Sequence, residues 1–531
     1  MITPGKKETD MVSDCSKSPT NIRIGDRVEC LGHIGTVKYI GPVETHSSNW
    51  LGIDWDDQFR GKHNGTINGV QYFESRFPKS GSFVRPEKVE LGHSVVKSII
   101  DRYGQNENET AAQQVQQKLF HFQQSINAPF LEMVGFDKIR DQQSNFDSLK
   151  VVNLRLQNIS SAGEPGQLKN LCPNIQELDL SKNLISYWIT VFDICIQLDQ
   201  LRWLNLSENQ LNTPNNVQDY CFPNVETLIC TSMNLTWEDI LEISVAFPGI
   251  QELRVPLNSI QCLNTPPNVL QSLRILDIDE NNIEKWSEIC KLCILENLEE
   301  LFIGNTGLRK IEFAGTAKKV NIFGKLKKLS ISYNQIDNWE SINELNRLKS
   351  LEDLRFVKNP ILETQSEANR FQIVVARIGN LKTFNGTEIK AENRRGAEYD
   401  YIKLYGLEWL RVKDTSTQRD EFLGLHNRYM DLIDMYGEPE ESELIIKPKS
   451  IKNTLVTLNI MYQDEKVVKK LPQTIVVHKL MVLVQKIFKL NQQPNLVYVS
   501  QDDPNFRIIL EDHRDLDFYS MRNGDIIVVS L

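Results

Sequence analysis

The sequence has 531 residues, which at about 150 residues per domain predicts three or four domains. Its 40% hydrophobic and 24% charged residues exclude collagen-like, wholly disordered and membrane-embedded chains. The net charge of −10 offers no large basic surface, so nucleic acid is excluded as a partner. No apolar run reaches the ~18 residues of a membrane span, and residues 1–21 lack the apolar core of a signal peptide. We therefore expect a cytoplasmic protein with a disordered N-terminus and no membrane partner.

Short glycine-rich strands with alternating aromatic residues fill residues 22–91 and predict a small, strongly bent β-barrel. Three segments follow in a fixed order: WLGID at 50–54, GKHNG at 61–65 and GSFVR at 81–85. This order resembles a CAP-Gly domain. Because the match spans the whole module, it is more specific than a lone glycine motif.

The resemblance implies a groove that captures an acidic C-terminal tail ending in an aromatic residue, as in α-tubulin. The carboxylates of such a tail need cationic and N–H donors, which Lys62 and Arg85 supply. The terminal ring needs aromatic walls, which Trp50 and Phe83 supply. The glycines of the loop 61–65 are expected to let the backbone approach the ligand closely.

Two loop positions depart from the usual family loop, Gly-Lys-Asn-Asp-Gly. Here His63 replaces the asparagine and Asn64 replaces the aspartate. A histidine still donates a hydrogen bond, so both residues stay in the predicted tail site, with a possible shift in tail preference. The alternative is that the loop residues only shape a tight turn. Trp55 and Tyr72 are expected to belong to the core.

The pattern LxxLxLxxNxL recurs in the middle of the chain, in six full copies and in three weaker copies that start at Val151, Val225 and Leu298. Its first positions fall at residues 151, 175, 201, 225, 250, 273, 298, 326 and 351. These spacings lie inside the window of leucine-rich repeats, roughly 20–29 residues. The alternating apolar positions suit a half-buried strand, and the ninth-position asparagine can satisfy backbone groups where the chain turns. Stacked units with one continuous core predict an α/β leucine-rich repeat solenoid.

A stacked array needs caps over its open ends. Residues 136–149 predict an amphipathic N-terminal cap, and 370–398 resemble the C-terminal cap of leucine-rich repeat proteins. With the helices that follow, the solenoid is expected to span 136–437. Before it, the polar segment 92–135 predicts a partly helical, partly flexible linker that lets the N-terminal module range over a partner. After it, residues 438–451 predict an acidic linker.

The outward strand positions of the repeats are expected to line a concave face, the usual binding surface of a solenoid. Trp203 and Phe302 have no burial reason to lie there, which favours binding over the alternative of a solvated face with scattered aromatics. Arg254 and Arg355 are the charged candidates on the same face.

Residues 452–531 show a hairpin, a helix and further strands, the order of a β-grasp fold. The segment NGDIIV at 523–528 resembles ubiquitin-like domains. The printed sequence lacks a terminal Gly-Gly, so we expect noncovalent docking in place of conjugation. His478 is expected on the surface of the helix.

No P-loop, nucleophile elbow, HExxH motif or paired metal-ligand spacing is present, so neither an enzyme nor a cofactor is expected. The lone pair Cys290 and Cys293 has no second pair and no nearby histidine, which argues against a metal or redox site. Three binding modules in one acidic chain indicate an assembly factor or an adaptor.

The order CAP-Gly, leucine-rich repeats and ubiquitin-like domain resembles the family of tubulin-folding cofactor E (tubulin-specific chaperone E) over nearly the whole chain. The resemblance implies binding of α-tubulin and a supercomplex with cofactors C and D and β-tubulin. With cofactor B, it implies disassembly of the αβ heterodimer, and it places the protein in the cytoplasm and cytoskeleton. The alternative is a non-folding adaptor that links tubulin or microtubules to the ubiquitin–proteasome system, through a noncovalent ubiquitin-pathway partner.

Overall fold

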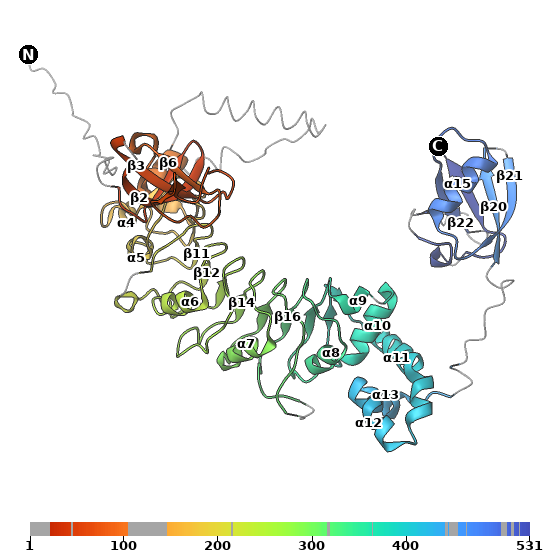
Figure 1. The fold of residues 1–531 in the computed structure, drawn as a ribbon. Helices are drawn as coiled ribbons and strands as arrows, with labels where there is room; N and C mark the ends of the chain where they lie inside the picture. The colour runs from red at the N-terminus through yellow and green to blue at the C-terminus, as the bar shows by residue number, and fades with distance from the viewer. Residues whose placement is uncertain are drawn as a thin grey trace, which may run out of the picture. The chain divides into compact units, whose positions relative to one another are not determined.

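The computed structural model covers most of the chain (Figure 1). The described residues are 22–43, 46–104, 146–213, 216–315, 319–363, 365–440, 444, 455–463, 465–500, 507–510, 514–519 and 521–530. The chain divides into two compact units, Met1–Ile402 with Val412–Gly437 and Lys403–Arg411 with Glu438–Leu531. Over the described residues, no helix combines the length and the apolar character that crossing a bilayer requires.

The N-terminal domain is a small antiparallel β structure, as the sequence predicts. Its main strands pair in the order β1-β2-β3-β6, and β4 and β5 form a separate hairpin. The strands are β1 (Arg27–Cys30), β2 (His33–Val43), β3 (His46–Trp55), β4 (Thr66–Ile67), β5 (Val70–Gln71) and β6 (Gly81–Val84). Alternate strand positions face inward, so Val28, Leu51 and Ile53 form a core with Trp55. The prediction that Trp55 is a core residue is confirmed, since it is fully buried.

The solenoid prediction is confirmed, because strands from successive repeats pair in parallel in one sheet. The sheet has eleven strands in the order β19-β18-β17-β16-β15-β14-β13-β12-β11-β10-β8. The strands are β8 (Val151–Asn153), β10 (Glu177–Asp179), β11 (Trp203–Asn205), β12 (Thr227–Ile229), β13 (Glu252–Arg254), β14 (Ile275–Asp277), β15 (Glu300–Phe302), β16 (Lys328–Ser330), β17 (Asp353–Arg355), β18 (Thr383–Phe384) and β19 (Thr387–Glu388). The helices between them are α4 (Gln167–Leu171), α5 (Trp188–Cys195), α6 (Trp237–Ser244), α7 (Trp286–Cys290) and α8 (Glu340–Leu345).

The repeat asparagines form a ladder of amide hydrogen bonds between neighbouring repeats. Asn183 Nδ2 donates to Leu154 O of the preceding repeat (2.9 Å) and to Leu180 O of its own (2.8 Å). Its Oδ1 accepts from the backbone N–H groups of Gln157 and Ile159, both at 3.0 Å. The same bond to a carbonyl of the preceding repeat is made by Asn209, Asn258, Asn281, Asn334 and Asn359. The ninth-position asparagine therefore satisfies buried backbone groups in six of the repeats.

The chain after the N-terminal domain enters the solenoid at once. β7 (His93–Ser94) pairs in parallel with β9 (Ile159–Ser161) of the first repeat. The helix α1 (Val95–Tyr103) follows directly, and the Ser94 hydroxyl caps its first turn.

This arrangement corrects the start of the linker that the sequence predicts over 92–135. Val95, Val96 and Ile99 lie in the solenoid core. They lie on one helical face that the first repeat buries, so this part of the segment is a cap and not a flexible connection. The remainder of 92–135 after Gly104, and most of the cap predicted over 136–149, lie outside the described residues.

Helices and a hairpin close the C-terminal end of the solenoid. The helices are α9 (Pro360–Glu363), α10 (Glu367–Arg377), α11 (Ala391–Val412), α12 (Ser416–Leu425) and α13 (Tyr429–Tyr436). Val374, Val375 and Ile378, inside the predicted cap segment, lie in the solenoid core. Arg377 joins the cap to the last repeats, because it donates to Asn343 Oδ1 (2.7 Å) and Leu425 O (2.6 Å).

The C-terminal domain has the β-grasp order that the sequence predicts. Its strands pair in the order β21-β20-β24-β22-β23. The elements are β20 (Leu455–Tyr462), β21 (Glu465–Pro472), α15 (Val477–Ile487), β22 (Asn495–Val499), β23 (Arg507–Ile509) and β24 (Ile526–Ser530). Leu480 and Val484 of the helix share a core with Leu458 and Ile527 of the sheet. His478 is exposed, as predicted.

Candidate functional site: a tail groove and a repeat face

The loop 61–65 is fixed to strand β6 by backbone hydrogen bonds. Gly81 O accepts from the N–H groups of Lys62 (2.8 Å) and His63 (3.2 Å), and Gly81 N–H donates to His63 O (2.8 Å). The Lys62 side chain remains exposed. The loop therefore holds the ammonium group of Lys62 at the domain surface, in a position that the backbone sets.

Close backbone packing inside the domain explains the glycines of the loop, whereas the sequence suggests a close approach to a ligand. A Cβ on Gly61 would fall 2.5 Å from the carbonyl oxygens of Gly81 and Lys79. Gly65 has φ +98°, and a Cβ there would fall 2.0 Å from Phe73 O. Both glycines are therefore required by backbone packing inside the domain, which accounts for them without any approach of backbone to a ligand.

Phe83 lies at the centre of a cluster of aromatic rings. Its ring centroid lies 5.3 Å from that of His63, 5.4 Å from Phe73, 5.5 Å from Tyr72 and 6.1 Å from Tyr39. Phe73 is buried and the other four side chains are half-buried. Three of the contacts with Phe83 are edge-to-face, the arrangement that the ring quadrupole favours. The expectation that Tyr72 belongs to the core is therefore wrong, because it lies on this partly exposed wall.

Strand pairing brings these rings together. Gly52 on β3 lies opposite Tyr39 on β2 and opposite Phe83 on β6. A Cβ on Gly52 would fall 2.5 Å from the Phe73 ring and 2.9 Å from Tyr39 Cβ. Glycine at this position therefore leaves room for the cluster. The sequence analysis missed Tyr39 and Phe73, although glycine opposite two aromatic positions in paired strands is the signal that points to them.

His63 stands where the usual family loop has an asparagine, and its ring accepts a hydrogen bond inside the loop. Its Nδ1 accepts from Gly65 N–H (3.0 Å), which assigns the hydrogen of the neutral ring to Nε2. Burial lowers the pKa of His63, and the charge of Lys62 lowers it further, so the ring is neutral at physiological pH. Asn64 is exposed, and its Oδ1 accepts from Thr66 N–H at 3.3 Å, so it shapes the turn.

Trp50 and Arg85 pair with each other. The guanidinium carbon of Arg85 lies 3.9 Å from the Trp50 ring centroid, a cation–π contact. Arg85 also donates to Ser48 Oγ. Trp50 is thus stacked with a cation, whereas the sequence predicts it as an open aromatic wall beside Phe83. The wall around Phe83 is formed by Tyr39 and Tyr72.

Parallel register arranges the concave candidates in two adjacent rows across the sheet. Arg254, Phe302 and Arg355 occupy one row. Trp203 occupies the other row, on a strand nearer the N-terminus. Trp203, Arg254 and Phe302 are half-buried and Arg355 is exposed. The structure therefore places all four on one face without bringing them into a single cluster.

Most charges on this face are paired with neighbours. Lys328 Nζ lies 4.9 Å from the Phe302 ring centroid and 2.8 Å from the Glu300 carboxylate. Arg254 Nε lies 2.5 Å from Glu252 Oε1. Such partly exposed pairs contribute little free energy each, roughly 0–1 kcal/mol.

Carboxylates gather beside Arg254. Burial raises the pKa of Asp279 to about 6, and the charges of Asp277 and Glu280 add to the rise, against a hydrogen bond from Gly304 N–H. Burial also raises the pKa of Asp277. This part of the face is therefore acidic, and it suits a partner surface that carries positive charge.

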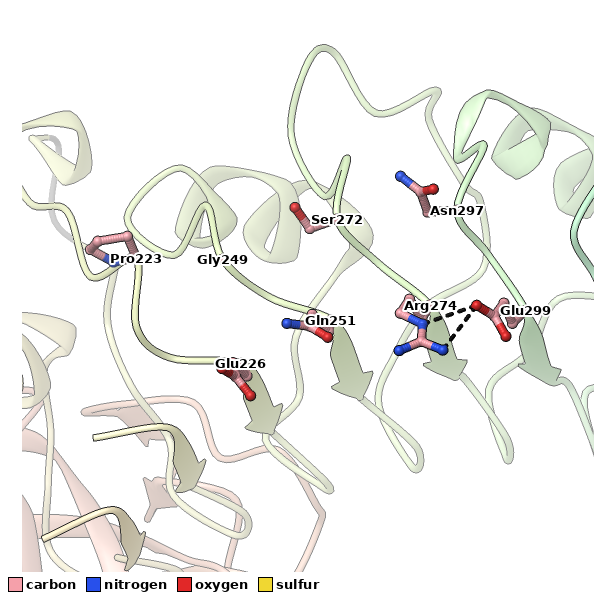
Figure 2. A pocket seen from close by; sticks show the side chains of 8 residues that line it. All are labelled: Pro223, Glu226, Gly249, Gln251, Ser272, Arg274, Asn297 and Glu299. Carbon is pink, nitrogen blue, oxygen red and sulfur yellow. Dashed lines mark hydrogen bonds and ion pairs between the residues drawn. The ribbon is translucent and has the colours of Figure 1, made fainter. Parts of the chain in front are cut away.

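A polar pocket of about 360 Å³ lies along the edge where four strands begin. Figure 2 shows Glu226, Gln251, Arg274 and Glu299 at the starts of neighbouring strands, with Arg274 turned toward Glu299. The Arg274 Nε to Glu299 Oε1 distance is 3.0 Å. Each of these four residues directly precedes a strand of the sheet. The pocket therefore lies at the edge of the repeat face, outside the two rows of concave candidates.

The three domains define a multidomain protein with an N-terminal CAP-Gly domain, a leucine-rich repeat solenoid and a C-terminal β-grasp domain. Residues 24–89 match the family model of the CAP-Gly domain. Tubulin-specific chaperone E of Bos taurus is 37% identical over 97% of this chain and 99% of its own length. The protein of that name from Homo sapiens is 38% identical over 95% of this chain and 98% of its own length. The chain belongs to the tubulin-specific chaperone E family.

A solved structure matches the last domain. The C-terminal ubiquitin-like domain of mouse tubulin-specific chaperone E is 31% identical, covering 15% of this chain and 91% of that chain, with a TM-score of 0.14.

Proposed function

We propose that this chain is a tubulin-folding cofactor that binds α-tubulin. The observation that carries the proposal is its match to Tubulin-specific chaperone E along 97% of its length. The geometry of the groove supports it, because a lysine, a histidine donor and an aromatic wall lie together around strand β6.

The α-tubulin tail binds in the groove beside the loop 61–65. The ammonium group of Lys62 pairs with a tail carboxylate, and His63 Nε2–H donates to another. The cluster around Phe83 packs against the terminal ring. Arg85, held on Trp50, adds a second cation in the same domain. Asn64 contributes to the site by stabilising the turn of the loop, because its Oδ1 accepts from Thr66 N–H.

The body of α-tubulin binds the concave face, with Trp203, Arg254, Phe302 and Arg355 as contact residues. With cofactors B, C and D and β-tubulin, the complex assembles and disassembles the αβ heterodimer, which places the protein in the cytoplasm and cytoskeleton. Two weak sites on one chain give a tight complex when a single partner engages both.

The role that we propose needs no catalysis. The relatives are named chaperones. Where the structure describes the chain, His, Cys, Asp and Glu side chains form no group of three that could hold a metal ion. Burial raises the pKa of Cys290 to about 11, so its thiol is protonated at neutral pH. GTP chemistry belongs to tubulin in this proposal.

The test is the affinity of the full chain for α-tubulin with and without the last residues of its tail. Removal of those residues should weaken binding about tenfold, and Lys62→Ala should do the same. Lys38→Ala is the matched control, because Lys38 is an exposed lysine of the same domain on β2. Unchanged affinity for both the shortened tail and the Lys62 variant would contradict the proposal.

A second candidate is an adaptor between tubulin or microtubules and the ubiquitin–proteasome system. The observation that favours it is an apolar row on the outer face of the C-terminal sheet. Ile509 is 73% exposed and Val528 is 39% exposed, and both lie opposite Val497, with Met461 beside Val528.

Cosedimentation with microtubules separates the two functions. An adaptor for the lattice pellets with microtubules, whereas a folding cofactor binds soluble subunits and, in excess, reduces polymer.

A further inference from the structure

The CAP-Gly domain contacts the second and third repeats directly, within one compact unit. The backbone N–H of Arg27 donates to the buried hydroxyl of Ser186 (2.8 Å). Gly25 lies against Tyr187, because a Cβ on Gly25 would fall 3.2 Å from the Tyr187 hydroxyl. Burial raises the pKa of Tyr187, and the carboxylate of Asp26 adds to that rise. The side chain of Tyr187 is therefore packed and electrostatically coupled to the CAP-Gly domain.

A chain of charged hydrogen bonds runs through the domain from this contact. Arg27 Nη1 donates to Asp56 Oδ1 (2.7 Å), and its Nη2 donates to the other oxygen. Arg76 donates to Asp56 Oδ1 (3.0 Å) and to Asp54 Oδ2 (2.7 Å). Ser80 Oγ donates to Asp54 Oδ1 (2.6 Å). Arg27 and Asp54 are buried, so each depends on these partners to keep its charge inside the fold.

One end of this network contacts the solenoid, and the other end lies next to the loop 61–65. Gln210 Nε2 of the third repeat donates to Asp56 Oδ1 at 3.4 Å, which adds a second contact to the solenoid. At the other end, Ser80 precedes Gly81, whose carbonyl holds the backbone of Lys62 and His63. The domain is therefore braced from its contact with the repeats to the loop of the tail groove.

The exit of the CAP-Gly domain is attached as well. His93 N–H donates to Asn158 O (3.0 Å) where β7 pairs with the first repeat. Gly92 has φ +75°, and a Cβ there would fall 2.2 Å from Asn158 O. Attachment at the exit and at Ser186 fixes the domain at two separated places, which opposes rotation about either one.

We propose that Ser186, Tyr187 and Gln210 form a seat that holds the tail groove at a fixed position on the solenoid. The groove and the concave face then present one rigid surface. The partner that fits is a globular protein whose acidic, aromatic-ended tail leaves its body near the N-terminal repeats. This inference rests on the proposed function and sets its geometry, because a fixed groove spares the partner the cost of ordering two independent domains.

The test separates the seat from the groove. Ser186→Phe removes the hydroxyl acceptor and fills the space under Arg27. Gln261→Phe is the matched control in a later repeat. Gln261 lies three residues after Asn258, as Ser186 lies three residues after Asn183, but it is exposed. In the full chain, the Ser186 variant should bind a synthetic acidic tail peptide with aromatic end as the unaltered protein does. Its affinity for whole α-tubulin should fall about tenfold, and its affinity for α-tubulin without the tail should stay the same.

A milder double variant, Ser186→Ala with Gln210→Ala, removes two hydrogen bonds to the CAP-Gly domain without adding volume. It should weaken α-tubulin binding about threefold, with peptide binding again unchanged. Full α-tubulin affinity in both seat variants would overturn the proposal, as would a parallel loss of peptide binding. If the unaltered protein binds whole and tail-less α-tubulin equally, the proposed tail binding has failed, which is a result distinct from failure of the seat.

Discussion

The proposed tail site and the concave face are built in opposite ways. The proposed tail site gathers five rings and one loop inside a small domain, and backbone hydrogen bonds with Gly81 hold the loop. The face spreads its candidates over strands β11 to β17, where most charges are already paired. Concentrated sites place their binding free energy in a few side chains, while paired surface charges each contribute little. Single substitutions should therefore be severe in the groove and mild on the face.

The largest effect is expected at Gly65. Gly65→Ala forces a side chain to φ +98° and into Phe73 O, so the loop must shift and tail binding should fall more than about 100-fold. Gly69→Ala is the control, because Gly69 has φ +83° but no atom within 4 Å of an added Cβ. Titration with a tail peptide measures both. Equal losses in the two variants would mean that backbone strain alone, and not the collision, explains the effect.

Phe83→Ala should come next. Loss of the central ring opens the aromatic wall, and tail-peptide affinity should fall about 30-fold, the size of a strong interface residue. Phe59→Ala removes the same side chain at a position that is 76% exposed, and it should change nothing. Isothermal titration of both variants tests the claim that the groove concentrates its binding free energy. A change of less than threefold at Phe83 would contradict it.

A substitution on the face should do much less. Arg254→Ala breaks ion pairs with Glu252 and Asp277. Affinity for α-tubulin should fall only about two- to threefold, because partly exposed ion pairs contribute little free energy. Affinity for the tail peptide should not change. Lys310→Ala, which breaks an exposed pair with Glu312, is the control. A tenfold loss at Arg254 would show that the face contains a concentrated site after all.

The smallest effect concerns stability. The pKa of Asp279 is about 6 in the fold, above its unfolded value of about 4, so the folded chain binds more protons between these pH values. That contribution is present below the unfolded pKa and is lost as pH rises through about 6. Asp279→Asn should therefore raise the free energy of unfolding by about 1 kcal/mol at pH 7, after allowance for partial exposure. Urea unfolding should show the advantage shrinking as pH is lowered to 5, while the exposed Asp337→Asn shows none.

The repeats were predictable because their signal is local and recurs. Each unit carries its own apolar positions, most units carry the asparagine, and Asn183 and Asn209 make the same bonds to the same kind of carbonyl. The groove was predictable only in part. Lys62 and Phe83 follow from the motif, but Tyr39 and Phe73 join Phe83 through strand pairing between distant segments, which a linear pattern does not encode.

The boundary after the first domain shows a further limit. Residues 93–103 combine two serines and four charged or polar positions with a short apolar stripe, and they precede a long polar run. Composition averaged over that window resembles a linker. Only the pairing of β7 with β9 reveals that Val95 and Ile99 have a core to enter.

The asparagine ladder has a consequence for how the solenoid comes apart. Because the amide of Asn281 donates to Val255 O of the repeat before it, these two repeats cannot separate without leaving a buried backbone group unsatisfied. Met233 and Thr306 take the place of the asparagine in two repeats, so the ladder is interrupted there. Under tension, the repeats should first separate at these two places.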